Sequence, residues 1–258
     1  MQLVGASALL CFAFDGRAQS LDSEPIQTDR PDFVESSNVV GPGRVQVETS
    51  FARESARGEG GREVLQSTPT LLRIGTGQDW EIRLETDGHV RQQSGNGASV
   101  RGYADLSVGM KWHARDQSGA LPSLALLVHA DLDSGSRALR GRGVRPSVRM
   151  VAEWELPADV SLGVMPGLAY ENTDDGRRFY QGIWGMVIGK AWTGRFRTFA
   201  EFAAPAIARS RHGATFSTYN AGAAYLLSDG CQIDVMVQRG ATRNAPDRAW
   251  SVGLSQRF

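Results

Sequence analysis

Charged side chains that alternate with apolar ones are the part of this sequence with the most chemical content. In the stretch 80–85, tryptophan, isoleucine and leucine alternate with Glu81, Arg83 and Glu85. Because successive side chains of a β-strand point to opposite faces, these acids and bases would share one face. The same alternation recurs along the chain and predicts an inward-facing charged lining made of Glu48, Arg73, Glu81, Arg83, Glu85, Asp105, Lys111, Arg149, Glu153, Arg197, Glu201 and Asp234.

Charges packed this densely are tolerable only when they are ion-paired or wet. The functional interpretation is a polar pore whose rings of charge set its selectivity. The structural interpretation is a salt-bridged plug that holds a narrow barrel rigid. The interleaved signs argue against a strongly anion- or cation-selective pore, and the residues alone leave both interpretations open.

Nucleophilic catalysis needs a nucleophile and a base within hydrogen-bond reach. His113 and His129 fall on predicted inward faces, whereas His89 and His212 fall in predicted loops. The sequence has no G-x-S-x-G elbow, and its histidine, cysteine and carboxylate spacing suits no metal site. No helix follows the glycine-rich stretch 58–61 to cradle a phosphate. We therefore expect no enzyme activity, no metal and no cofactor.

The elements that must position these charges are alternating stretches of roughly ten residues, the length of tilted membrane-spanning strands. Tight turns alternate with longer connections rich in Gly, Ser, Asn, Asp and Arg, as expected of periplasmic turns and outer loops. Pro69 and Pro166 lie inside such stretches, where we expect bulges or small strand shifts. The predicted strands are 44–53, 64–74, 80–88, 102–114, 121–132, 144–156, 160–171, 179–191, 195–205, 214–227, 231–239 and 249–258.

The final stretch indicates how the sheet ends. Trp250, Val252, Leu254 and the terminal Phe258 form an apolar face opposite small or polar residues. An open strand edge in hydrocarbon costs several kcal/mol for each unpaired backbone group, so this strand should close onto the first one. The pattern also predicts a C-terminal signal for the barrel-assembly machinery. Aromatic residues gather at both ends of the strands, as in the two girdles of a membrane barrel, whereas a β-sandwich would draw them to its core.

The predicted fold class is therefore all-β, a transmembrane antiparallel up-and-down β-barrel of about 12 strands over residues 44–258. Lys+Arg and Asp+Glu both number 28, which gives no basic balance for nucleic acid. Residues 1–18 have the apolar core and small cleavage residues of a signal peptide. Residues 19–43 are expected to form a periplasmic N-terminal segment. There Arg30 would either reach lumen carboxylates such as Glu48 or Glu201, gating the mouth, or belong to a cap that only seals it.

A family resemblance begins in this segment. Thr28, Asp29, Arg30 and Pro31, followed by Glu35 and Ser36, resemble the opening of the "MetA pathway of phenol degradation" family. Ala104–Lys111, Tyr225–Asp229 and the C-terminal residues are similar to later parts of that family, so the resemblance covers nearly all of the mature chain. Leu132–Gly135 departs from the family's usual Pro-Thr-Gly. The resemblance implies an outer-membrane barrel linked to uptake of aromatic compounds.

Two functions follow as hypotheses. The first is passive uptake, across the bacterial outer membrane, of small and possibly aromatic or hydrophobic solutes whose identity the sequence does not give. The second is a structural or surface-interaction barrel with a plugged lumen. In either case we expect contact with outer-membrane lipid and lipopolysaccharide. The second hypothesis assigns binding of lipopolysaccharide phosphates to the outer-loop residues Arg137, Arg140, Arg142, Arg177 and Arg178.

Overall fold

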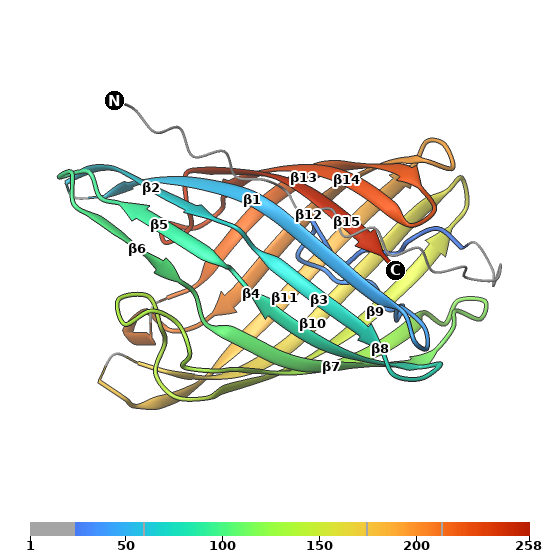
Figure 1. Ribbon diagram of the computed structural model, residues 1–258, viewed down its shortest axis with the longest axis horizontal. Coiled ribbons are helices and arrows are strands. Elements are labelled where there is room, and N and C mark those ends of the chain that lie inside the picture. Colours follow the sequence, from blue (N-terminus) through green and yellow to red (C-terminus); the bar gives the residue numbers. More distant parts are fainter. Residues whose placement is uncertain (1–23, 59, 174, 213) are drawn as a thin grey trace, which may run out of the picture.

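The computed structural model describes residues 24–58, 60–173, 175–212 and 214–258, which form one closed antiparallel sheet (Figure 1). A single 3-10 turn, η1 (Ser210–His212), interrupts the β structure. The strands of this part of the chain are β1 (Val45–Gly58), β2 (Gly61–Ser67), β3 (Thr70–Gly75), β4 (Trp80–Thr86), β5 (His89–Gln93), β6 (Ser99–Tyr103), β7 (Leu106–Arg115), β8 (Ser123–Asp131), β9 (Arg145–Leu156), β10 (Val160–Asn172), β11 (Arg178–Ala191), β12 (Phe196–Ile207), β13 (Phe216–Ser228), β14 (Cys231–Gly240) and β15 (Arg248–Arg257).

These strands form twelve barrel positions. β2 with β3, β4 with β5, and β6 with β7 are each two halves of one position, separated by short breaks. β15 pairs with β1 along its length, and the N–H of Val45 donates to the carbonyl of Phe258 at 3.2 Å. The predicted closure by the last strand and the predicted fold class are thus confirmed.

Prolines disturb the sheet differently from what the sequence predicts. Pro69 lies in the break between β2 and β3, but the register against β1 is the same on both sides of it. Pro166 pairs with Trp184 without any shift, so the bulge expected there is wrong. A bulge lies instead at Pro205 in β12, where the register slips against both β11 and β13. A proline lacks the N–H of a ladder hydrogen bond, and a bulge accommodates that loss.

The outer surface of the barrel is an apolar belt. On β15, the outward Val252 is 51% exposed, whereas the inward Ser255 is 1% exposed. Aromatic pairs mark the two rims of the belt: the rings of Trp80 and Trp112 stack at 5.7 Å, and those of Phe51 and Trp250 lie 5.7 Å apart. A closed antiparallel barrel with such a belt is the architecture of bacterial outer-membrane proteins, and this places the protein in the outer membrane.

Among the described residues, none of the helical structure is long and apolar enough to span a membrane. The predicted signal peptide, residues 1–18, lies outside the described residues.

The two ends of the barrel differ. The C-terminus, the start of β1 and the tight turns 76–79, 157–159 and 229–230 lie at one end, on the right of Figure 1. The hairpin β5–β6 and the longer connection 132–144 lie at the other end. We assign the end with tight turns to the periplasm, because short periplasmic turns and longer outer loops are typical of these barrels.

Candidate functional site

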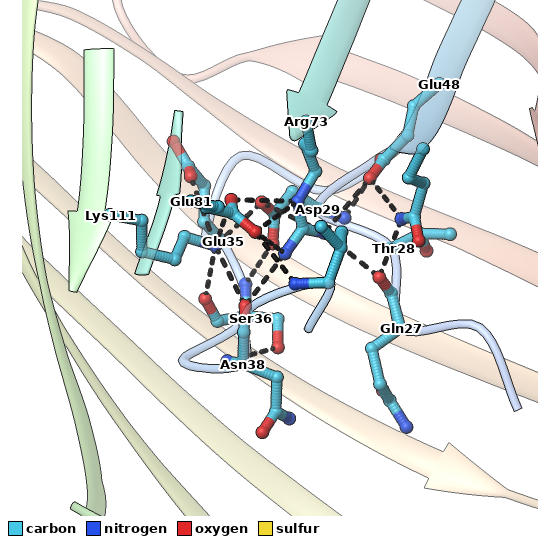
Figure 2. A network of polar contacts seen from close by, with 12 residues as sticks. Gln27, Thr28, Asp29, Glu35, Ser36, Asn38, Glu48, Arg73, Glu81 and Lys111 are labelled. Carbon is cyan, nitrogen blue, oxygen red and sulfur yellow. Dashed lines mark hydrogen bonds and ion pairs between the residues drawn. The ribbon is translucent and has the colours of Figure 1, made fainter. Parts of the chain in front are cut away.

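The N-terminal segment, residues 24–43, lies inside the barrel rather than beside its periplasmic mouth (Figures 1 and 2). Ile26, Asp29 and Val34 are each 3% exposed, and Ser37 is 1% exposed. The segment forms no strand or helix, so its backbone groups need partners from the barrel wall.

Four inward glutamates supply acceptors for the backbone N–H groups of this segment. Glu48 Oε2 accepts from Asp29 and Arg30, each at 2.9 Å. Glu201 Oε1 accepts from Phe33 at 2.9 Å and from Val34 at 2.7 Å. Two further bonds run from Ser37 to Glu153 at 2.5 Å and from Val40 to Glu81 at 3.0 Å. Strands β1, β4, β9 and β12 thus hold the segment through carboxylates at four separate places.

Inward cations supply donors for its carbonyl groups. Arg73 of β3 donates through Nη1 to the carbonyl of Gln27 at 3.0 Å and through Nη2 to that of Asn38 at 2.8 Å. Lys111 Nζ of β7 donates to the carbonyl of Ser36 at 2.7 Å. Acidic wall residues therefore accept from the N–H groups of the segment, and basic wall residues donate to its carbonyl groups (Figure 2).

Asp29 is the residue on which these cations converge. Its Oδ2 lies 2.5 Å from Arg83 Nη1, 2.7 Å from Lys111 Nζ and 3.3 Å from Arg73 Nη1. Its Oδ1 accepts from the N–H of Ser36 at 2.8 Å, which closes the segment on itself. Burial disfavours the charged carboxylate, but the three cations outweigh burial and hold the pKa of Asp29 well below its usual value.

Glu35 completes this ion-pair cluster. Its Oε2 lies 2.7 Å from Arg83 Nη2, and its Oε1 accepts from Arg149 Nη1 at 3.0 Å. Burial raises the pKa of Glu35, but the cations led by Arg83 lower it below its ordinary value overall. In this cluster the carboxylates of Asp29, Glu35, Glu48 and Glu81 balance the cations Arg73, Arg83, Lys111 and Arg149. The charges that the sequence places on one face are therefore paired mainly through the N-terminal segment.

The opposite side of the lumen contains an apolar cluster. Phe33 and Val34 pack into a cluster of inward side chains from β8, β9, β10, β11, β12 and β14, which are Ala125, Leu127, Val151, Met165, Val187, Phe199 and Met236. Leu127 and Phe199 are large apolar residues on the inward faces of their strands, where alternation predicts polar ones. They belong to the same cluster as Val34. A Cβ built on Gly185 would lie 2.6 Å from Val34 Cγ2, so glycine leaves the space that this valine fills.

The segment separates two cavities in the lumen. A cavity of about 470 Å³ faces the outer loops and is lined by Arg30, Phe33 and Leu139 among others. A cavity of about 600 Å³ faces the periplasm and is lined by Ile26, Val34 and Glu153 among others. Asp32 lines both cavities and therefore marks the boundary between them.

Asp32 is weakly paired for a buried carboxylate. Its Oδ1 has no hydrogen-bond partner and lies 3.8 Å from Arg197 Nη2. Burial raises the pKa of Asp32 to about 7; Arg197 opposes this shift, whereas Glu201 and Glu153 add to it.

The remaining predicted lining residues occupy other places. Glu85 is half-buried on the wall of the outer cavity. Asp105 lies between β6 and β7, where it accepts from the N–H groups of Gly135 and Gly141 at 2.8 Å each and so anchors the outer loop 132–144. Asp234 is buried in β14, and neither of its carboxylate oxygens has a hydrogen-bond partner.

The side chain of Arg30 makes a different contact from the pairing with Glu48 or Glu201 that one of the two hypotheses expects. Its guanidinium Nε donates to Ser50 Oγ at 3.2 Å, while it is the backbone N–H of Arg30 that reaches Glu48. The Thr28–Ser36 motif contacts the barrel wall mainly through its backbone groups and through the side chains of Asp29 and Glu35. Alternation does not predict the apolar partners of Phe33 and Val34, although Leu127 and Phe199 signal them as apolar residues at inward positions.

The described residues contain no group of three or more His, Cys, Asp or Glu side chains that could hold a metal ion. His129 is buried in β8, and its two ring nitrogens have no hydrogen-bond partner. His113 contacts the carbonyl of Ser37 at 3.0 Å and the carboxylate of Asp116 at 3.1 Å.

Fold and site together define an outer-membrane β-barrel whose lumen is filled by the segment that precedes its first strand. Residues 28–258 match the family "MetA-pathway of phenol degradation", and the chain belongs to that family. The match includes the Thr28–Ser36 motif, which lies within the segment that the barrel wall holds.

Solved structures show the same fold. An outer-membrane channel from Pseudomonas putida F1 is 12% identical, with a TM-score of 0.65, and the match covers 86% of this chain and 98% of that one. The NanC porin is 10% identical, with a TM-score of 0.57, over 83% and 100% of the two chains. The KdgM porin, solved in complex with disordered oligogalacturonate, is 9% identical, with a TM-score of 0.52, over 83% and 99%. None of the curated proteins matches the sequence.

Proposed function

We propose that the protein is a passive outer-membrane channel for small, aromatic or hydrophobic solutes, and that the N-terminal segment controls passage through its lumen. The observation that carries the proposal is the pair of cavities separated by one irregular segment. The segment is held by hydrogen bonds and ion pairs from several strands and is not part of the sheet. It can therefore change its position while the ring of paired strands stays intact.

The lining supports the solute class. The outer cavity combines apolar residues, including Leu65, Leu71 and Val90, with nine charged residues of both signs, among them Glu85 and Arg149. Below it, Phe33 and Val34 contact the apolar side of the lumen. A wall that combines apolar surface with fixed charges of both signs suits a small molecule that has an apolar ring and a polar group. The family's association with phenol degradation agrees with an aromatic solute.

The test measures entry of a monoaromatic compound. Vesicles with a lipopolysaccharide outer leaflet, which slows direct permeation, would carry the purified mature barrel and be exposed to phenol or toluene. We expect faster entry of the aromatic than in empty vesicles, with little entry of a glucose control. Equal entry with and without folded barrel would reject the channel.

A structural or surface-interaction barrel is the second candidate, because the segment fills the lumen in this structure. It predicts barrels that migrate as folded, heat-modifiable species but pass neither aromatic nor polar solute. We also propose that the protein has no enzymatic activity. Hydrolysis of phospholipid or lipopolysaccharide by the purified barrel would contradict this.

A further inference from the structure

Five arginines gather outside the lumen, at the end of the barrel away from the tight turns. They line one open cavity of about 620 Å³ between the ends of β1, β2, β14 and β15, and they are Arg57, Arg62, Arg239, Arg243 and Arg248. Asp247 is the one acidic residue on the same lining. The cluster is thus strongly basic in a chain whose charges balance overall.

These guanidinium groups lack the ion pairs that the lumen arginines Arg73, Arg83 and Arg149 have. In the part of the chain that the structure describes, none of the five is in an ion pair, and one of them, Arg62, donates to Ser55 Oγ at 3.2 Å. Arg57 and Arg62 also face each other directly in the β1–β2 ladder. Like charges at directly opposite positions destabilise a sheet, and an anion between them would relieve that repulsion.

The cluster faces the membrane side of the wall. Arg57 shares its face of β1 with the exposed Phe51, and Arg248 shares its face of β15 with the exposed Trp250. Phe51 and Trp250 form the aromatic pair at the outer rim of the belt. At a rise of about 3.3 Å per residue, Arg248 lies about 7 Å beyond Trp250 along β15, and Arg57 lies about 20 Å beyond Phe51 along β1. Arg248 is therefore at the level at which the apolar belt gives way to lipid headgroups, and Arg57 lies farther from the belt.

We propose that this arginine cluster binds the phosphate groups of an outer-leaflet lipid of the lipopolysaccharide class. Guanidinium groups bind phosphate oxygens through charge-assisted, often bidentate hydrogen bonds. A solute in the lumen cannot contact Arg57, Arg239 or Arg248, because these side chains lie on the outward faces of their strands, the faces that lipid would adjoin. The proposal depends on the barrel spanning the outer membrane and not on whether solute passes through it.

This site differs from the outer-loop arginines considered from the sequence. Arg140 lies 3.8 Å from the Asp133 carboxylate and Arg177 lies 2.8 Å from that of Asp175. Arg178 lies over the ring of Tyr170, 5.0 Å from its centroid. Because these three already have partners, they serve as a matched control set.

The experiment uses the full mature barrel in detergent and native mass spectrometry with added lipid A. The test variant combines Arg57→Gln, Arg239→Gln and Arg248→Gln, and the control variant combines Arg140→Gln, Arg177→Gln and Arg178→Gln. We expect the test variant to lose at least about tenfold in affinity for bisphosphorylated lipid A, and the control variant to bind like the wild type. Heat-modifiable migration checks that both variants fold.

Further arms identify the ligand chemistry without relying on the triple variant. The wild type should bind lipid A stripped of both phosphates weakly, and inorganic phosphate should not displace the bisphosphorylated form. Displacement by inorganic phosphate would make this a site for free anions and overturn the assignment to lipid. Equal binding of phosphorylated and stripped lipid A, or equal losses in both variants, would also overturn it. If the triple variant does not fold, Arg57→Gln alone is compared with Arg140→Gln by the same criterion.

Discussion

The ammonium group of Lys111, in the middle of β7, lies 2.7 Å from the carboxylate of Asp29, a residue that precedes the first strand. Both side chains are almost fully buried. This contact ties the N-terminal motif to the barrel wall, since Arg73 and Arg83 meet the same carboxylate oxygen. The charged lining therefore binds a segment of the same chain, which alternation alone does not predict.

Replacing Asp29 should release the segment. In Asp29→Asn the three cations lose a shared anion, and the cluster is left with one uncompensated buried positive charge. Removing one partner of a buried ion pair costs roughly 3–5 kcal/mol. We expect larger or more frequent single-channel openings and faster proteolysis near residue 29. The control is Asp175→Asn, because Asp175 is paired with Arg177 in an outer loop.

A double-mutant comparison separates this effect from general damage to the barrel. Lys111→Met should also loosen the segment, since it buries an apolar group beside carboxylates. In the double variant with Asp29→Asn, the loss in the free energy of unfolding should be smaller than the sum of the losses in the two single variants, because the two residues share one interaction. Strict additivity would mean that the Asp29–Lys111 pair does not hold the segment.

Removing Glu201 should free the middle of the segment. In Glu201→Ala the backbone N–H groups of Phe33 and Val34 lose their acceptor in the lumen. Each buried donor left without a partner costs about 1–3 kcal/mol. We expect increased hydrogen exchange at Phe33 and Val34 and higher conductance. Asp79→Ala, which changes an exposed aspartate of the tight turn 76–79, should leave both unchanged.

The sequence predicts the barrel well because its outer face meets one uniform solvent. Hydrocarbon selects an apolar residue at every outward position, so alternation locates β14 and β15 closely. The lumen imposes no such uniform rule. Leu127 and Glu81 both point inward, one into the apolar cluster that contains Val34 and the other accepting from the N–H of Val40. Which wall residue meets which part of an irregular segment depends on the path of that segment, and no periodicity encodes a path.

Filling the space at Gly185 should displace the segment without changing any charge. A Cβ at this position would lie 2.6 Å from Val34 Cγ2 and 3.0 Å from Phe33 Cδ1, so Gly185→Val must push these side chains away. Overpacking of this kind typically costs 1–3 kcal/mol. We expect higher conductance with the barrel still folded. Gly194→Ala has no heavy atom within 4 Å of its new Cβ and should behave like the wild type. Unchanged conductance in Gly185→Val, with Val34 still protected from exchange, would contradict the packing argument.

Passage through the lumen should rise with pH because of Asp32. Burial, reinforced by Glu201 and Glu153, raises the pKa of Asp32 from 3.8 to about 7, while Arg197 opposes the shift. A carboxyl whose pKa is higher in the folded state stabilises that state when protonated. The stabilisation of the folded state by protonated Asp32 is therefore complete below about pH 4, is lost as the pH rises, and is gone above about pH 7.

Asp29 and Glu35 do not compete in this window, because their pKa values are lowered and they stay ionised through it. Single-channel recordings on either side of about pH 7 should show more openings on the alkaline side. Asp32→Asn keeps the shape of the side chain but cannot ionise, so it should hold the acidic behaviour at both pH values. The same pH response in Asp32→Asn and in the wild type would show that another group controls the segment.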